Sequence, residues 1–484
     1  RDRLRSRGLG DVYKRQMLFS SMTFVFMFLP IVCAIYLLVR PEIRNYILLA
    51  ASMLFYAWGE PKYLAIMILT ILVNYTGANY ISRSRNLIHR KLLLVATILV
   101  DLSFLFYFKY FNFVLDNINH LFHTHIDFID VIMPIGISFY TFQALSYVVD
   151  VYRGEVKAQR DIYKLALYIT LFPQLVAGPI VKYHDVAEQI SCRTVTFDKV
   201  AYGVKRFIIG LAKKMLIANT LGAVADKIFA QPVEQFDTLT AWIGAIAYTL
   251  QLYYDFSGYS DMAIGLGSIF GFKFLENFNY PYISKSITEF WRRWHISLST
   301  WFKEYLYIPL GGNRVSQRRN LFNLFVVFLA TGIWHGASWN FVFWGLWHGI
   351  FIIFEKITGW HKRSGGLKIN IAQHLYTIFA FVIGWVMFRA DNMAYACEYI
   401  KNMFGLIAEH QITYKLPYYI DNIEIIAFTA AVFCAMPLFK GMLDIKYKHK
   451  VLRTLVNVWL ILLFVLSSAE IAASTYNPFI YFRF

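Results

Sequence analysis

Long apolar stretches separated by short charged connections dominate the chain from residue 17 onward. A helix needs about 20 mostly apolar residues to cross the hydrocarbon core of a membrane. Stretches of this kind predict about twelve spans, at 18–39, 45–58, 63–81, 92–112, 130–151, 206–229, 239–270, 321–338, 339–355, 371–389, 423–439 and 454–472. The pattern therefore predicts an all-α polytopic membrane protein.

The connections between these spans differ in charge, and the difference predicts their orientation. Cytoplasmic loops are enriched in Lys and Arg. The connections 82–91 and 356–370 each carry four basic and no acidic residues, and 440–453 carries five basic and one acidic, so we place all three in the cytoplasm. The connections 112–130 and 230–238 carry acidic but no basic residues, which places them outside.

One apolar stretch does not fit a straight span. If 152–205 is cytoplasmic at both ends, the segment 165–181 must enter and leave the membrane on the same side. Pro173, Gly178 and Pro179 interrupt any continuous helix there. We expect a re-entrant segment, which is tolerated at membrane depth only when protein buries it or when it lines a cavity.

Composition agrees with the apolar pattern. The 484 residues are 58% hydrophobic and only 16% charged, whereas soluble domains carry about 25% charged residues. The net charge of +17 fits cytoplasmic loops better than a nucleic-acid surface, because every basic stretch is flanked by apolar runs of lipid length. Residues 1–16 (RDRLRSRGLGDVYKRQ) lack apolar periodicity, so we treat them as a non-native tail. Residues 17–484 then form a single membrane domain, with a catalytic core at about 130–355.

No cofactor or metal site is expected. The four cysteines are scattered without metal-like or disulfide spacing, and His120, His123 and His125 lack a fourth ligand. The sequence also contains no GxSxG elbow, HExxH, P-loop or GxGxxG motif, which argues against hydrolases, zinc proteases, NTPases and dinucleotide enzymes.

Buried carboxylates are the first candidate functional groups. Asp255, Ser257 and Asp261 lie in an otherwise apolar span, where a charged side chain is costly and often functional. The alternative is that these carboxylates are tied to a neighbouring group and serve helix packing.

The segment 276–314 is the second candidate region. Ile287, Phe290, Trp291, Trp294 and Leu298 fall on one side of a predicted helix, and Glu289, Arg292, Arg293 and Lys303 fall around the others. This pattern is typical of an amphipathic helix at the membrane interface, whose basic face meets lipid headgroups or a phosphate-bearing donor. His295 lies within it, either as a packed residue or as a catalytic one.

Two further histidines lie in lipid-length apolar sequence, His335 and His348, each followed by a glycine. Burial disfavours the charged imidazole, so each is expected to stay neutral and able to accept a proton. A general base needs this property to take the proton of a hydroxyl that attacks an acyl carbonyl. The alternative for each is a core histidine that is hydrogen-bonded to a neighbour.

At these residues the chain resembles the membrane-bound O-acyltransferase family, and closely its bacterial alginate O-acetyltransferase branch. The resemblance rests on the order of six matching stretches: PIGISFYTFQ (134–143), FPQLVAGPI (172–180), DFSGYSDMAIG (255–265), EFWRRWHISLSTWFKEYLYIPLGGNR (289–314), GIWHGA (332–337) and NPFIYFRF (477–484). Lys303 and Glu304 stand where that branch commonly has Arg and Asp, which keeps the charges.

The resemblance implies that His335 is the essential catalytic histidine and that His295 is the second. It also implies a ring of about 11–12 tilted helices with a thin, tunnel-bearing centre. A thioester donor, acetyl-CoA or an acyl-carrier thioester, would approach from the cytoplasm and an exported polysaccharide from outside. We group as candidate substrate- or donor-binding residues Asp255, Ser257, Asp261, Arg292, Arg293, Trp334 and His348.

The expected reaction is O-acetylation of an exported, alginate-like polysaccharide at the bacterial cytoplasmic (inner) membrane. The longest outward loop, roughly 390–422, is too short to grip a polymer, so a periplasmic or surface acetyltransferase of the SGNH type is the expected partner, with an acyl carrier protein as another. Two alternatives stay open. One is D-alanyl transfer to teichoic acid, and the other is a transporter that uses its buried histidines as a proton relay.

Overall fold

The computed structural model describes residues 17–176, 178–363, 365–407, 411–439 and 450–473, and it is helical with no strand in these ranges. The tail 1–16 and the motif at 477–484 therefore lie outside the described residues. The chain forms two compact units. The first holds the described residues up to Phe207 together with Asp261–Leu275, and the second holds Ile208–Ser260 and the described residues from Glu276 onward.

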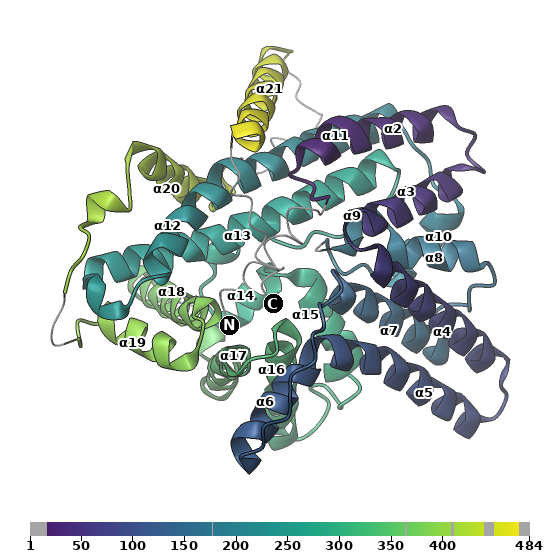
Figure 1. Cartoon of the computed structure of the whole chain (residues 1–484), viewed down its shortest axis with the longest axis horizontal. Coiled ribbons are helices and arrows are strands. Elements are labelled where there is room, and N and C mark those ends of the chain that lie inside the picture. Colours follow the sequence, from purple (N-terminus) through teal and green to yellow (C-terminus); the bar gives the residue numbers. More distant parts are fainter. Residues whose placement is uncertain (1–16, 177, 364, 408–410, 440–449, 474–484) are drawn as a thin grey trace. The chain divides into compact units, whose positions relative to one another are not determined.

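Nine α-helices of the described residues lie wholly within the first unit (Figure 1). They are α2 (Leu29–Leu38), α3 (Arg44–Gly59), α4 (Leu64–Arg83), α5 (Leu87–Leu105), α6 (Phe111–Phe122), α7 (Ile137–Arg153), α8 (Ile162–Thr170), α9 (Phe172–Leu175) and α10 (Tyr183–Ser191). The helices α4, α5 and α7 pack side by side, and a buried Asn74–Asp101 hydrogen bond of 2.9 Å joins α4 to α5.

The predicted re-entrant segment is broken in the structure. Helix α8 ends at Thr170 and the short α9 begins at Phe172, next to Pro173. Gly136 lies at φ +72°, just before α7, and a Cβ there would come within 2.6 Å of the Leu175 carbonyl oxygen. Only glycine fits both the left-handed backbone and this close approach. The start of α7 and the end of α9 are therefore packed backbone against backbone.

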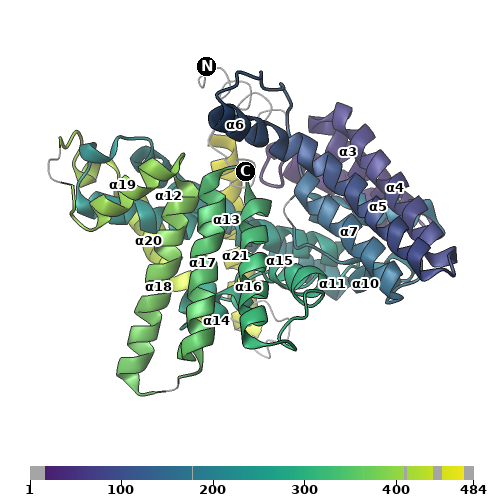
Figure 2. The ribbon, with the colours of Figure 1, turned by 90° about the horizontal axis from the view of Figure 1, so that it is seen from below.

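The second unit carries the candidate chemistry. Its helices are α12 (Asn219–Phe229), α14 (Ile287–Arg293), α15 (Ile296–Phe302), α16 (Gln317–His335), α17 (Trp339–Thr358), α18 (Leu367–Arg389), α19 (Met393–Met403), α20 (Asn422–Cys434) and α21 (Lys450–Ala473). Helices α11 (Phe197–Ala212) and α13 (Thr238–Ile269) contribute residues to both units. Figure 2 shows α16, α17 and α18 running alongside one another.

Short non-α helical turns connect several of these elements. Four are π-helical, at Phe24–Phe28, Phe106–Tyr110, Lys213–Ala218 and Lys303–Tyr307. The 3-10 turns lie at Pro61–Tyr63, Val233–Gln235, Pro281–Ile283, Trp360–Lys362, Leu416–Tyr418 and Pro437–Phe439.

Helices α16 and α17 cross at glycines. A Cβ on Gly332 would collide with the Phe341 carbonyl oxygen, and a Cβ on Gly345 would collide with that of Phe328. Small residues at a crossing let membrane helices approach closely, which increases their van der Waals contact. The crossing also fixes the C-terminal turn of α16, where His335 is the last residue.

Six helical segments among the described residues are long and apolar enough to cross a membrane. They are Pro61–Arg83, Leu87–Phe122, Phe197–Phe229, Trp339–Thr358, Leu367–Arg389 and Lys450–Ala473, and each overlaps a predicted span. The predicted spans 18–39 and 423–439 correspond to the shorter apolar helices Phe24–Leu38 and Asn422–Cys434. The protein is an all-α polytopic membrane protein.

Connections that we place on the same side of the membrane contact each other within the second unit. Of those placed outside, the backbone NH of Gln411 donates to the Glu234 carbonyl at 2.8 Å, and the Asn402 amide donates to the Val233 carbonyl at 3.0 Å. Of those placed in the cytoplasm, the Lys285 ammonium of the segment 276–314 donates to Asn370 Oδ1 of the connection 356–370 at 3.3 Å. The outer loop 390–422 also contains helix α19, so it is structured rather than a simple connection.

Candidate functional site

The amphipathic segment is not one helix at a membrane surface. It divides into α14 and α15 at His295, whose backbone has φ 44° and ψ 54°. A left-handed conformation at a residue other than glycine costs about 1–3 kcal/mol and is often found at functional sites. The break turns the chain, and the His295 side chain is fully buried instead of facing an interface.

Helix α14 enters the interior of the second unit with its N-terminus anchored on α17. The buried Glu355 carboxylate accepts hydrogen bonds from the backbone NH groups of Ile287 at 2.6 Å and Thr288 at 2.9 Å. A carboxylate at a helix N-terminus satisfies free NH groups and complements the helix dipole. This anchor was missed in the sequence, because nothing near 287 points to residue 355.

From this anchor α14 runs antiparallel along α17. The Trp291 ring lies 5.2 Å from His348 and 5.7 Å from Trp344. Trp344 is eleven residues before Glu355, which is about 16 Å along a helix. His295, just beyond the end of α14, therefore lies away from the Glu355 end of α17, inside the second unit. The apolar face predicted for this segment is correct, since Ile287, Phe290, Trp291, Trp294 and Leu298 are all buried.

Three aromatic rings enclose His335 at the C-terminus of α16. Its imidazole centroid lies 4.9 Å from Trp334, 4.8 Å from Trp344 and 5.3 Å from Phe388, all in edge-to-face arrangements. The histidine is 6% exposed. Aromatic side chains therefore line three sides of the imidazole.

The structure brings His295 and His335 to the same indole. The Trp334 ring is 6.2 Å from the His295 ring and 4.9 Å from the His335 ring. Phe256 packs on His295 at 4.6 Å with an interplanar angle of 86°. Two histidines that are 40 positions apart in the sequence are thus neighbours around one buried tryptophan.

His348 has a different environment. It is fully buried among Phe290, Trp291, Trp344 and Trp385, and neither ring nitrogen has a hydrogen-bond partner among the described residues. A Cβ on Gly384 would lie 2.9 Å from its Nε2, so α18 closes one side of the ring. This position suits a residue that supports the His335 enclosure through Trp344 better than one that meets a substrate.

The three polar residues predicted in α13 do not form one group. Asp255 makes a buried ion pair with Lys214 at 2.5 Å in the second unit. Asp261 pairs with Arg206 at 2.6 Å in the first unit. Ser257 is buried, with no hydrogen-bond partner for its hydroxyl among the described residues. The two carboxylates are therefore neutralised by cations in the neighbouring helical segment, which fits the packing alternative. Lys214 and Arg206 both lie within an apolar stretch of the sequence, and this signal for the partners of the two carboxylates was missed.

The basic residues of α14 differ in how they are used. Arg293 donates to Glu289 at 2.9 Å and to the Asn279 carbonyl at 3.1 Å, so its guanidinium is committed within the segment. Arg292 and Lys303 are exposed. Of the predicted cations, these two are open to a negatively charged donor.

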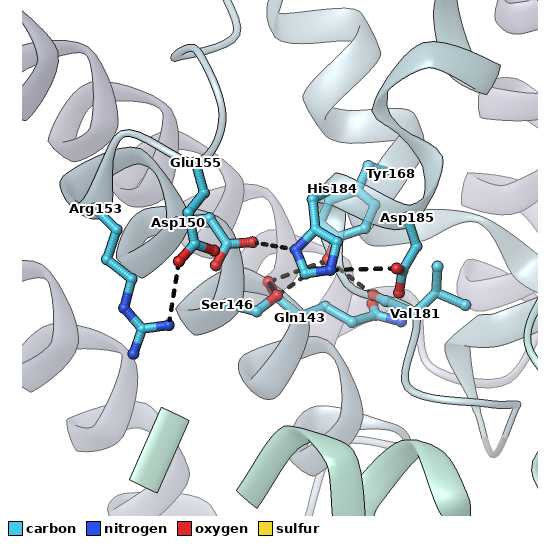
Figure 3. Close-up of polar contacts among 9 residues, drawn as sticks. All are labelled: Gln143, Ser146, Asp150, Arg153, Glu155, Tyr168, Val181, His184 and Asp185. Atoms are coloured by element: carbon cyan, nitrogen blue, oxygen red, sulfur yellow. Dashed lines mark hydrogen bonds and ion pairs between the residues drawn. The ribbon is translucent and has the colours of Figure 1, made fainter. Parts of the chain in front are cut away.

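A polar cluster in the first unit combines His184 with three carboxylates (Figure 3). His184 Nδ1 lies 2.9 Å from Asp150, and Nε2 lies 3.2 Å from Asp185. These hydrogen bonds, to Asp150 first and then to Asp185, raise the pKa of His184 to about 10. Asp150, Glu155 and His184 are close enough to share a cation, but both ring nitrogens already face carboxylates, so the arrangement fits a charged imidazolium. His120, His123 and His125, which the sequence analysis set aside as metal ligands, are exposed.

Comparison with known proteins identifies the family to which this chain belongs. The model of the membrane-bound O-acyltransferase family matches residues 155–390. The probable alginate O-acetylase AlgI of Pseudomonas putida is 40% identical over 97% of this chain and 100% of its own length. The peptidoglycan O-acetyltransferase of Helicobacter pylori is 36% identical over 81% of this chain and 80% of its own.

A more distant similarity is to the teichoic acid D-alanyltransferase of Bacillus subtilis, which is 30% identical over 52% of this chain and 66% of its own length. The matched region of the family model contains both His295 and His335. The protein is an acyltransferase embedded in the membrane, and it belongs to the membrane-bound O-acyltransferase family.

Proposed function

We propose that this acyltransferase moves an acetyl group from a cytoplasmic thioester donor to the outer side of the bacterial cytoplasmic membrane, for O-acetylation of an exported, alginate-like polysaccharide. The observation that carries the proposal is the packing of His295 and His335 on one buried indole. The names of the more similar relatives support it, because alginate and peptidoglycan O-acetylation both place acetyl groups on glycans. The D-alanyl relative is less similar and matches less of the chain.

In this mechanism a hydroxyl oxygen attacks the carbonyl carbon of the thioester. A carbon–oxygen bond forms, the carbon–sulfur bond breaks, and the thiolate leaves on the donor side. His335 accepts the hydroxyl proton as general base, which typically contributes about 10²–10⁴-fold in rate. His295 orients the donor or stabilises the developing oxyanion. The proton then returns to the thiolate, which balances the reaction.

The polarity of α16 supports an acceptor that arrives from outside. The helix begins at Gln317, after the segment that we place in the cytoplasm, and it ends at His335. The acetyl donor is acetyl-CoA or an acyl-carrier thioester, and the exposed Arg292 and Lys303 are the groups that attract its negative charge.

A separate outer acetyltransferase, of the SGNH type, completes transfer to the polymer in this proposal. The described part of the loop 390–422 contains α19 and a 3-10 turn. Asn402 of α19 and the backbone NH of Gln411 donate to carbonyls of the connection 230–238. This loop leaves little chain for a polymer-binding surface. An acyl carrier protein is the expected alternative source of the donor.

Isotope-labelled acetate in living cells tests the proposal. A host that lacks the gene is complemented with the wild-type chain, with His335→Ala or with His361→Ala, and the label on the exported polymer is measured. His361 bonds only a backbone carbonyl at the end of α17, which makes it a matched control. We expect label with the wild type and with H361A, and none with H335A at equal membrane abundance. Normal labelling with H335A would refute the catalytic assignment. Label on the polymer from D-alanine supplied in place of acetate would select the D-alanyl reaction.

A further inference from the structure

The side chain that holds His295 is Asn277, a residue in the connection that follows α13. Asn277 is fully buried, and its Oδ1 lies 3.2 Å from His295 Nδ1. The same oxygen accepts hydrogen bonds from the backbone NH of Ser297 at 3.1 Å and from its hydroxyl at 2.9 Å. The amide nitrogen donates to the Ser260 hydroxyl at 3.0 Å.

These contacts determine which way the Asn277 amide faces. A backbone NH is only a donor, so the atom opposite Ser297 N must be the oxygen of the amide. The atom that faces His295 Nδ1 is therefore an acceptor. Nδ1 makes this hydrogen bond only when it carries the hydrogen, and a neutral imidazole carries one hydrogen. The lone pair of the ring then resides on Nε2.

The backbone around His295 is held by the same residue. The NH of Ile296 donates to the Asn277 carbonyl at 2.9 Å, and the NH of Asn279 donates to the Arg293 carbonyl at 2.9 Å. This short pairing fixes the left-handed turn at His295 and aims its ring at Trp334. Main chain and side chain of Asn277 thus specify both the direction and the protonation pattern of the imidazole.

We infer that Asn277 is a positioning residue that fixes His295 as the Nδ1–H tautomer, so that Nε2 meets the substrate as a hydrogen-bond acceptor. This inference rests on the proposed function and refines it. A neutral ring whose Nε2 carries a lone pair cannot donate a hydrogen bond from that atom to an oxyanion. Nε2 instead accepts a hydrogen bond from an O–H or N–H group of a substrate. Of the two roles proposed for His295, this is the donor-orienting one.

The tautomer is measured directly by ¹⁵N NMR on the full-length protein, labelled at histidine and reconstituted in lipid nanodiscs, with His295→Gln to assign the signal. We expect one protonated nitrogen, Nδ1, in the wild type. Asn277→Ala should produce Nε2–H or a mixture of tautomers, while Ser260→Ala, which removes only the partner of the Asn277 nitrogen, should keep Nδ1–H. A wild-type signal from Nε2–H, or an unchanged tautomer in N277A, would overturn the inference whether or not the protein acetylates a polysaccharide.

Catalysis gives a second readout, in inverted membrane vesicles from the complemented host supplied with labelled acetyl-CoA. N277A should lower the initial rate of polymer labelling by on the order of 10²-fold or more, with a small change in KM. Asn277→Asp keeps the acceptor but adds a negative charge that favours the imidazolium, so the acidic limb of the pH–rate profile should move up by about 1 unit or more.

Asn402 provides the matched structural control. It is also a fully buried asparagine, and its amide donates to the Val233 and Phe236 carbonyls at 3.0 and 2.8 Å. Asn402→Ala should lower protein yield without moving the pH profile. If N277A does not fold, the pH–rate profile of N277D tests the inference. An active N277D protein whose acidic limb is unshifted would contradict it. If the wild-type protein labelled no polymer, the proposed function itself would be refuted.

Discussion

His184 is held as a cation between carboxylates from two helices, Asp150 of α7 and Asp185 of α10 (Figure 3). Glu155 also lies close to the His184 ring, and Lys182 stands two residues before His184 in the sequence. A residue whose pKa is raised on folding binds its proton more tightly in the folded state. Its contribution to stability is complete below the unfolded pKa of about 6.5 and disappears as the pH rises through about 10.

We therefore expect His184→Gln to be less thermally stable than the wild type near pH 6–7. The difference should shrink steadily as the pH approaches 10, because the wild-type imidazolium is then lost. Glutamine keeps a hydrogen-bonding group without the charge, so it isolates the electrostatic part. The check is the melting temperature of both detergent-solubilised proteins across this pH range. A difference that is constant with pH would contradict a charged His184.

At the scale of residues, the sequence identified the chemistry-bearing types but not their partners. His335 stood out as an imidazole in apolar sequence, whereas the second histidine, His295, was singled out by the family resemblance. Asn277 did not stand out, because one polar residue between Glu276 and Phe278 has no periodic signal and its target lies 18 positions away. Lys214 and Arg206 were likewise missed, although a cation inside an apolar stretch was available as a signal for the partners of Asp255 and Asp261.

At the scale of elements, the position of His335 depends on how closely α16 and α17 approach. Gly345 faces the backbone of Phe328 and Gly332 at the crossing, so any side chain there must push the helices apart. Trp344, the neighbour of Gly345, forms one wall of the His335 enclosure. Helix packing and site geometry are therefore coupled through two consecutive residues.

Gly345→Val should destabilise the protein by about 1–3 kcal/mol, as overpacking generally does, and should reduce acetyl transfer in the protein that still folds. Ile350→Phe is the control, since Ile350 lies on the same helix, 63% exposed, and enlarging it meets no backbone. Thermal stability in detergent and polymer labelling in cells are the measurements. Equal behaviour of the two variants would argue against a tight crossing.

The elements themselves were largely predictable. Apolar length predicted the long helices, and Pro173 predicted the break between α8 and α9. The prediction that 276–314 forms a single interfacial helix was wrong. An amphipathic pattern shows which face is apolar, but not whether lipid or protein packs against that face. Here helices α17 and α18, far along the chain, pack against it.

For the whole molecule, the proposed direction of acetyl transfer depends on which connections face the cytoplasm and which face outward. The charge of the connections places Cys192 in the cytoplasm and Cys397, in α19, outside. Both thiols are exposed, whereas Cys33 and Cys434 are partly covered. If this orientation is correct, the chain carries one exposed native cysteine on each side of the membrane.

A membrane-impermeant maleimide applied to spheroplasts should label Cys397 and leave Cys192 unlabelled, in a background where Cys33 and Cys434 are serine. Cys192 should react once the membrane is opened with detergent, which serves as the control for reactivity. Labelling of Cys192 in intact spheroplasts would reverse the proposed orientation, and with it the side from which the thioester approaches His295.

We propose that His295 and His335, which both pack on Trp334, form a single catalytic site. A double-mutant cycle of the two histidines is the direct test. Initial rates of acetyl transfer from labelled acetyl-CoA are measured in inverted vesicles for H295A, H335A and the double variant. Residues that act as a unit are strongly non-additive. We predict that the double variant is no slower than the slower single variant, within about tenfold. Losses that multiply, so that the double variant falls by the product of the two single effects, would contradict a shared site.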